Sequence, residues 1–61
     1  MEKDESRERA AAARLMRWYG RSEAENQALF NHSAAERNTP AREFWIRVYE
    51  IVHDAPAGGL V

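Results

Sequence analysis

The two histidines are the side chains of this 61-residue chain best suited to proton transfer or metal binding near neutral pH. His32 and His53 lie far apart in the sequence, and the chain contains no cysteine. Neither histidine has carboxylates around it at the spacing of a known metal-ligand set. We therefore predict no metal site and no cofactor, and we interpret both histidines as surface or boundary residues.

Paired carboxylates are the next candidates for chemistry. Glu23 with Glu25, and Glu43 with Glu50, could in principle serve as general acid and base. Such a pair needs a cleft that excludes water and shifts a pKa, and a chain this short has little room for one. No serine lies in a nucleophile-elbow motif. These observations predict a protein that is not an enzyme and has no small-molecule substrate.

The charged residues of the segment 9–21 are all arginines, and Trp18 and Tyr19 are interleaved with them. Arginines neutralise phosphates and aromatic rings stack on bases, so this segment is a candidate nucleic-acid surface. The candidate contact residues are Arg14, Arg17 and Arg21. A net charge of −1 gives no general attraction to phosphate, and both aromatic residues are expected in the core. Nucleic-acid binding is therefore the alternative function.

Helices must position all of these groups. Apolar residues of the segment 40–54 recur at the spacing of one helical face, and Thr39 before Pro40 is typical of a helix start. The alanine-rich segment 6–19 favours a helix that stops at Gly20, in the left-handed conformation that glycine adopts without strain. A second helix would then cover 22–37. One continuous helix through Gly20 is the alternative, since glycine costs only about 1 kcal/mol in a helix interior.

The predicted fold class is all-α, a small bundle of two or three short helices, with dimerisation as one way to complete it. Residues 1–61 would form a single small domain, with disordered tails at 1–5 and 55–61. The predicted core draws on the apolar residues of all three segments: Leu15, Tyr19, Ala28, Phe44, Trp45, Val48 and Val52.

Several large apolar residues lie off this core. Phe30, Ile46 and Tyr49 do not follow the central seam, and large uncovered apolar side chains mark interaction surfaces. We therefore predict a small interaction or regulatory module whose exposed anchors are these three residues. Its partner would be a second copy, giving a homodimer, or another protein.

The composition is that of a helix-rich protein with nearly balanced charge, nine basic against ten acidic residues. No long apolar run and no basic-then-apolar leader is present, so we expect a cytoplasmic protein that does not enter a membrane.

The segments AARLMRWYG, SEAENQALF and RNTPAREFWIRVYEIV together resemble short, uncharacterised bacterial all-helical proteins. The resemblance covers about residues 10–53 and rests on Gly20, Trp45, Val48 and the alanines. It implies a helical fold and no known activity, so it carries no site residue to this chain.

Overall fold

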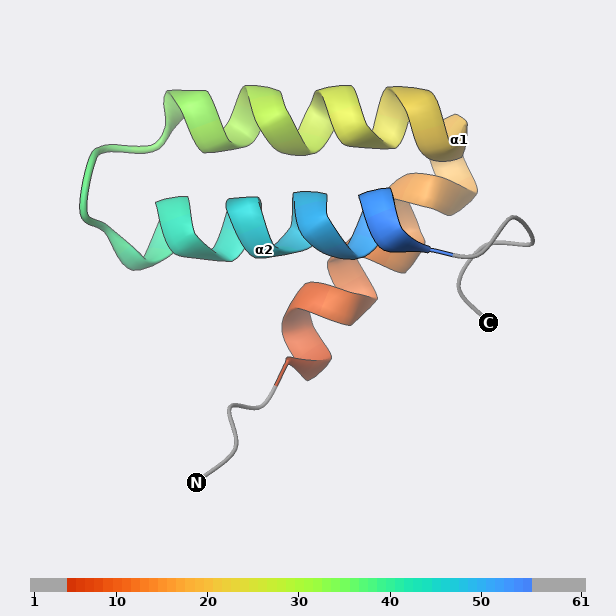
Figure 1. The fold of residues 1–61 in the computed structure, drawn as a ribbon, viewed down its shortest axis with the longest axis horizontal. Coiled ribbons are helices and arrows are strands. Elements are labelled where there is room, and N and C mark those ends of the chain that lie inside the picture. Colours follow the sequence, from red (N-terminus) through yellow and green to blue (C-terminus); the bar gives the residue numbers. More distant parts are fainter. Residues whose placement is uncertain (1–4, 56–61) are drawn as a thin grey trace.

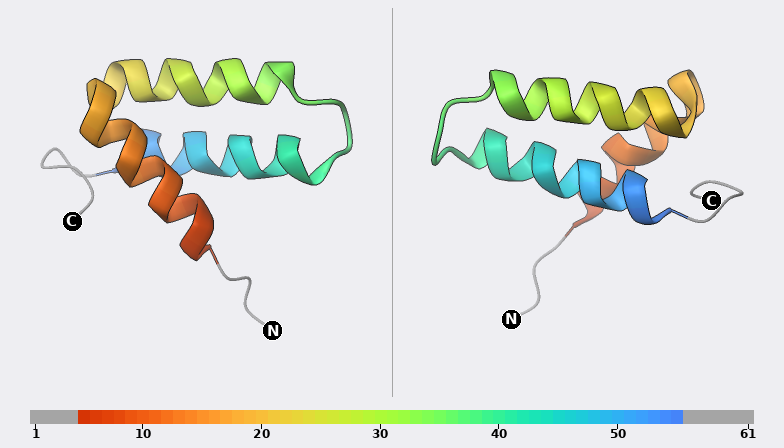
Figure 2. Two further views of the ribbon diagram at one scale, coloured as in Figure 1. Left: turned by 180° about the vertical axis from the view of Figure 1, so that it is seen from behind. Right: turned by 45° about the horizontal axis from the view of Figure 1, so that its top comes forward.

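Two helices make up the computed structural model, which describes residues 5–55. Helix α1 spans Ser6–Ala34 and helix α2 spans Pro40–Asp54. The second part of α1, residues 21–34, runs antiparallel beside α2, and its first part, residues 6–19, crosses one side of this helical hairpin (Figure 1). The views in Figure 2 show the same crossing from behind and from above. The predicted all-α class is confirmed.

Gly20 makes the turn between the two parts of α1. Its φ of 80° and ψ of 168° are non-helical, and this combination is open to glycine almost alone. A Cβ atom at this position would meet no atom within 4 Å, so the backbone conformation rather than crowding requires glycine. The predicted interruption is confirmed, with the expected positive φ but an extended ψ in place of a left-handed helical one.

The connection between the helices begins earlier than predicted. Helix α1 ends at Ala34 rather than Arg37, and Ala35 already has an extended backbone. Asn38 has a φ of 59°, which asparagine tolerates better than most residues, and Thr39 is extended as the residue before a proline tends to be. Reversing the chain direction needs these non-helical residues, which is why the helix cannot reach the predicted end.

Thr39 caps the start of α2, as predicted. Its Oγ1 accepts a hydrogen bond from the Arg42 backbone N–H at 3.3 Å and donates one to the Glu36 carbonyl at 2.7 Å. Pro40 occupies the first turn, where a missing N–H costs nothing. The Arg42 side chain reaches back to the Ala35 carbonyl at 3.2 Å, so the connection is hydrogen-bonded to both helices.

The core is built from small side chains of α1 and valines of α2. Its fully buried members are Ala12, Ala24, Ala28, Val48 and Val52. Three of the predicted core residues are among them. The predicted members Leu15, Phe44 and Trp45 pack against this cluster and stay partly exposed. Alanines on α1 leave space for the branched side chains of α2, so the helices approach closely along this seam.

The prediction that Tyr19 lies in the core is wrong, because 49% of this residue is exposed. Trp18, also expected on the buried face, is 75% exposed. Arg21 donates hydrogen bonds to carbonyl groups at the C-terminal end of α2, which places the Gly20 corner beside that end. Tyr19 therefore lies where α2 is ending and has little of that helix to pack against.

An ion pair joins the start of the described chain to the middle of α2. Arg47 donates to both carboxylate oxygens of Glu5, from Nε at 2.6 Å and from Nη2 at 2.9 Å. Glu50 accepts from the same guanidinium at 3.1 Å, and these hydrogen bonds, those to Glu5 first, raise the pKa of Arg47. The predicted disordered tails included Glu5 and Ala55, and at these two residues the prediction is wrong. Glu5 is held by Arg47, and Ala55 is buried. Residues 1–4 and 56–61 of those tails lie outside the described residues.

Candidate interaction surfaces

Phe30 lies on the outer face of α1. Ala28 is fully buried in the core, and a residue two positions further along a helix points to nearly the opposite side. Phe30 is accordingly 70% exposed, and the neighbouring Leu29 is also exposed. The exposed ring gives the outer face of α1 an apolar centre.

The other two predicted anchors occupy different places. Tyr49 packs against the core cluster and stacks on the His53 ring, with ring centroids 5.8 Å apart. Ile46 is half-buried and lines a hollow beside the connection between the helices, which His32 also lines. Two of the three predicted interface residues thus lie on α2, and Phe30, on α1, is the most exposed of the three.

The arginines of the candidate nucleic-acid surface divide into two kinds. Arg14 and Arg17 are exposed on the first part of α1. Arg21 is half-buried and donates to the His53 carbonyl at 3.2 Å and to the Ala55 carbonyl. A cation at this position also suits the negative end of the α2 dipole. Arg21 therefore joins the Gly20 corner to α2, whereas the other two arginines face solvent.

Trp18 is the surface residue that sequence reasoning missed. Its predicted place is the buried face of the first helix, because it follows Leu15 by three residues and Ala11 by seven, the spacing of a shared helical face. That spacing gives no sign of its exposure. The structure puts its exposed indole on the same helical segment as Arg14 and Arg17.

Among the histidines and carboxylates considered for catalysis, His53 and Glu25 come together. His53 Nδ1 is 3.3 Å from a Glu25 carboxylate oxygen, so this pair links α2 to α1. Glu23 accepts a hydrogen bond from Gln27 within its own helix, and Glu50 pairs with Arg47. Among residues 5–55, no three potential metal-binding side chains come together.

Comparison with known proteins finds no matching family, no similar curated protein and no similar solved structure. Within the described part of the chain, neither helix has both the length and the apolar character that crossing a membrane requires. Interpretation of function therefore rests on the exposed surfaces.

Proposed function

We propose that this protein is a non-enzymatic interaction module that presents the outer face of α1 to a second copy of itself or to another protein. The observation that carries this proposal is the 70% exposure of Phe30. Aromatic residues are enriched at protein interfaces, where a few side chains carry most of the binding energy, and they bury a large area with few rotatable bonds. Ile46 and Tyr49, predicted with Phe30 as anchors, would contribute at the edge of the contact.

The size of the protein supports a partner as well. A chain of about this length has a core that supplies only a few kcal/mol of net stability, and its fully buried residues are small ones. Covering Phe30 and Leu29 would add apolar burial that the single chain lacks. A homodimer formed by two copies of the outer face of α1 would cover both copies of these residues at once.

Sedimentation equilibrium over a wide concentration range tests this proposal. We expect the wild type to show a concentration-dependent mass, and Phe30→Ser to raise the dissociation constant about tenfold or more. Ile46→Asp should also weaken association while leaving the far-ultraviolet circular dichroism of the monomer unchanged. Trp18→Ser removes another exposed aromatic residue and serves as the matched control, since it should leave association intact. A wild type that stays monomeric at every concentration would contradict self-association.

The alternative function is binding of single-stranded nucleic acid by the first part of α1, and the exposure of Trp18 favours it. An uncovered indole beside Arg14 and Arg17 combines a stacking surface with phosphate-binding cations. Arg21, the third arginine of this prediction, would contribute mainly by holding the segment in place, because its guanidinium already binds the end of α2.

Fluorescence anisotropy with labelled single-stranded oligonucleotides tests the alternative. Binding should weaken steeply between about 50 mM and 200 mM salt if phosphates are contacted. Trp18→Ala should weaken it through lost stacking, and the double variant Arg14→Gln, Arg17→Gln should reduce its salt dependence. Phe30→Ser is the matched control here and should bind normally. Absence of any anisotropy change at low salt would remove this function.

A further inference from the structure

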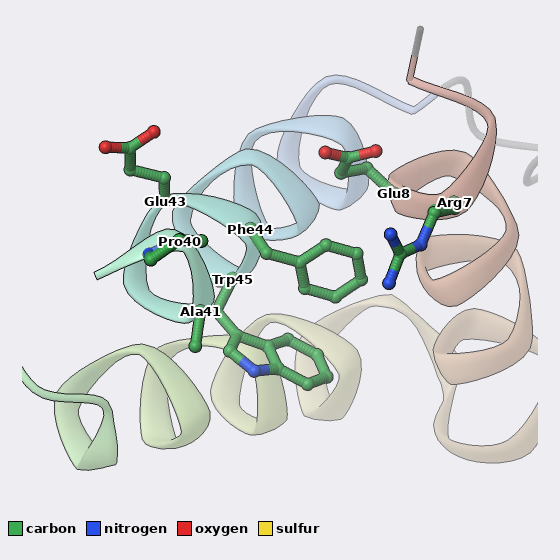
Figure 3. A pocket seen from close by; sticks show the side chains of 7 residues that line it. All are labelled: Arg7, Glu8, Pro40, Ala41, Glu43, Phe44 and Trp45. Carbon is green, nitrogen blue, oxygen red and sulfur yellow. The ribbon is translucent and has the colours of Figure 1, made fainter.

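The crossing of the first part of α1 over α2 leaves a hollow of about 520 Å³ near the start of α2. Figure 3 shows its walls: the Phe44 ring and the Trp45 indole come from α2, and Arg7 and Glu8 come from the first part of α1 across from them. Hollows of this volume are within the range that proteins use for small ligands. Neither Phe30 nor Trp18 lines the hollow. Binding of a ligand there would therefore not require either proposed function to be correct.

Glu8 is the unusual residue of this hollow. Only 8% of it is exposed, and no hydrogen-bond or ion-pair partner for its carboxylate is found in the part of the chain that the structure describes. Carboxylates are rarely buried to this extent without a partner. Among the described residues no side-chain oxygen is both sealed from solvent and without a hydrogen bond, so the Glu8 carboxylate oxygens remain accessible. The carboxylate thus borders a partly apolar hollow and forms no ion pair with residues 5–55, although Arg7 lines the same hollow.

The rings beside Glu8 add a second preference for positive charge. Phe44 and Trp45 meet edge to face, with centroids 5.0 Å apart, and both are partly buried. Aromatic faces attract ammonium groups and at the same time cover the apolar stem that carries them. A carboxylate together with two aromatic rings therefore matches a ligand that has a cationic head and an apolar body.

We propose that this hollow binds an ammonium group on an apolar stem, with the Glu8 carboxylate accepting hydrogen bonds from the ammonium and Phe44 and Trp45 covering the stem. The ligand is a free primary amine or the lysine side chain of a peptide, which share this chemistry. Arg7 is exposed, and its guanidinium points toward the Phe44 ring (Figure 3), where its charge opposes the incoming cation. Glu43 also lines the hollow, but its carboxylate points away from the two rings (Figure 3).

Titration of Trp45 fluorescence tests this site directly. The chain has two tryptophans, and the exposed Trp18 can be replaced by phenylalanine so that Trp45 alone reports. The probes are phenethylamine and Nα-acetyl-lysine amide, with 3-phenylpropionate as an aromatic anion for comparison. We expect a saturable change with at least one of the two amines, and the tighter of them identifies a free amine or a lysine side chain as the better ligand. The anion should produce no saturable change.

Matched variants assign the binding to Glu8. Glu8→Gln should weaken amine binding about tenfold or more, the loss expected for one charge-assisted hydrogen bond. Glu43→Gln makes the same charge change on the same hollow and should alter binding much less, whereas Arg7→Gln should strengthen it. Thermal unfolding checks the fold, and Glu8→Gln should leave the midpoint at or slightly below that of the wild type, because Glu8 lies in the first turn of α1, where a carboxylate suits the helix dipole. Failure of both amines to bind, equal binding of the anion, or undiminished binding to Glu8→Gln would overturn the proposal.

Discussion

Replacement of Gly20 by alanine tests how far the fold depends on one backbone conformation. With φ of 80° and ψ of 168°, an L-residue is held in a region that costs roughly 1–3 kcal/mol. No side-chain clash adds to this cost, since a Cβ would meet no atom within 4 Å. The core of a chain of this size rarely supplies more than about 3–5 kcal/mol of net stability, so Gly20→Ala should remove a large part of it.

The alanine variant has a second way to respond. Alanine favours a helix interior by about 1 kcal/mol over glycine, so α1 could straighten into one continuous helix. Straightening would take Ala12 out of the core and separate Glu5 from Arg47. A straight α1 could recover those contacts only from another copy, so the variant would exchange this segment between two chains.

Urea unfolding followed by circular dichroism, with sedimentation at the same protein concentration, distinguishes these responses. We expect either a lower unfolding midpoint in a protein of unchanged mass or a new exchanged dimer. Ser22→Ala, at an exposed helical position of the same corner, is the control and should change stability by less than about 0.5 kcal/mol. Chemical synthesis with D-alanine at position 20 should recover much of the loss, because D-residues favour positive φ. Unchanged stability and unchanged mass in Gly20→Ala would refute this reasoning.

Three further substitutions examine the seam, the cap and the ion pair. Ala28→Leu places a large side chain at a fully buried position between the helices and should cost about 1–3 kcal/mol in urea unfolding; wild-type stability would contradict the close approach there. Thr39→Ala removes the N-cap of α2 and should lower the free energy of unfolding by about 1 kcal/mol, whereas Thr39→Ser should retain most of the stability. Equal losses in the two variants would exclude the hydroxyl as the cause. Glu5→Gln breaks the bidentate contact with Arg47 and should lower the thermal midpoint, by a smaller amount at high salt. The control Glu23→Gln loses only a contact within its own helix and should have little effect.

The helix α2 could be predicted from the sequence almost residue by residue. Thr39 and Pro40 are local signals, and the apolar spacing that follows is long enough to be unambiguous. The interruption at Gly20 was also predictable, because it depends on a single residue type. Both features are decided by residues close together in the chain, which is the range over which sequence patterns carry structural information.

The exposure of the aromatic residues before Gly20 could not be predicted in the same way. Trp18 and Tyr19 are exposed because the corner lies at the end of α2, and the position of that end relative to the corner depends on packing. The contact between Glu5 and Arg47 and the burial of Glu8 likewise arise from the crossing of two segments distant in sequence. Such crossings depend on the side chains of both segments together, so no local sequence pattern predicts them.

The most direct test of the proposed function is a dilution series of ¹H–¹⁵N correlation spectra, which locates any association surface at single residues. If the outer face of α1 associates, the concentration-dependent shifts will be largest at Phe30, Leu29 and the exposed positions one turn away, Asn26 and Ser33. Shifts centred elsewhere on the molecule, or spectra that do not change with concentration, would contradict self-association through this face.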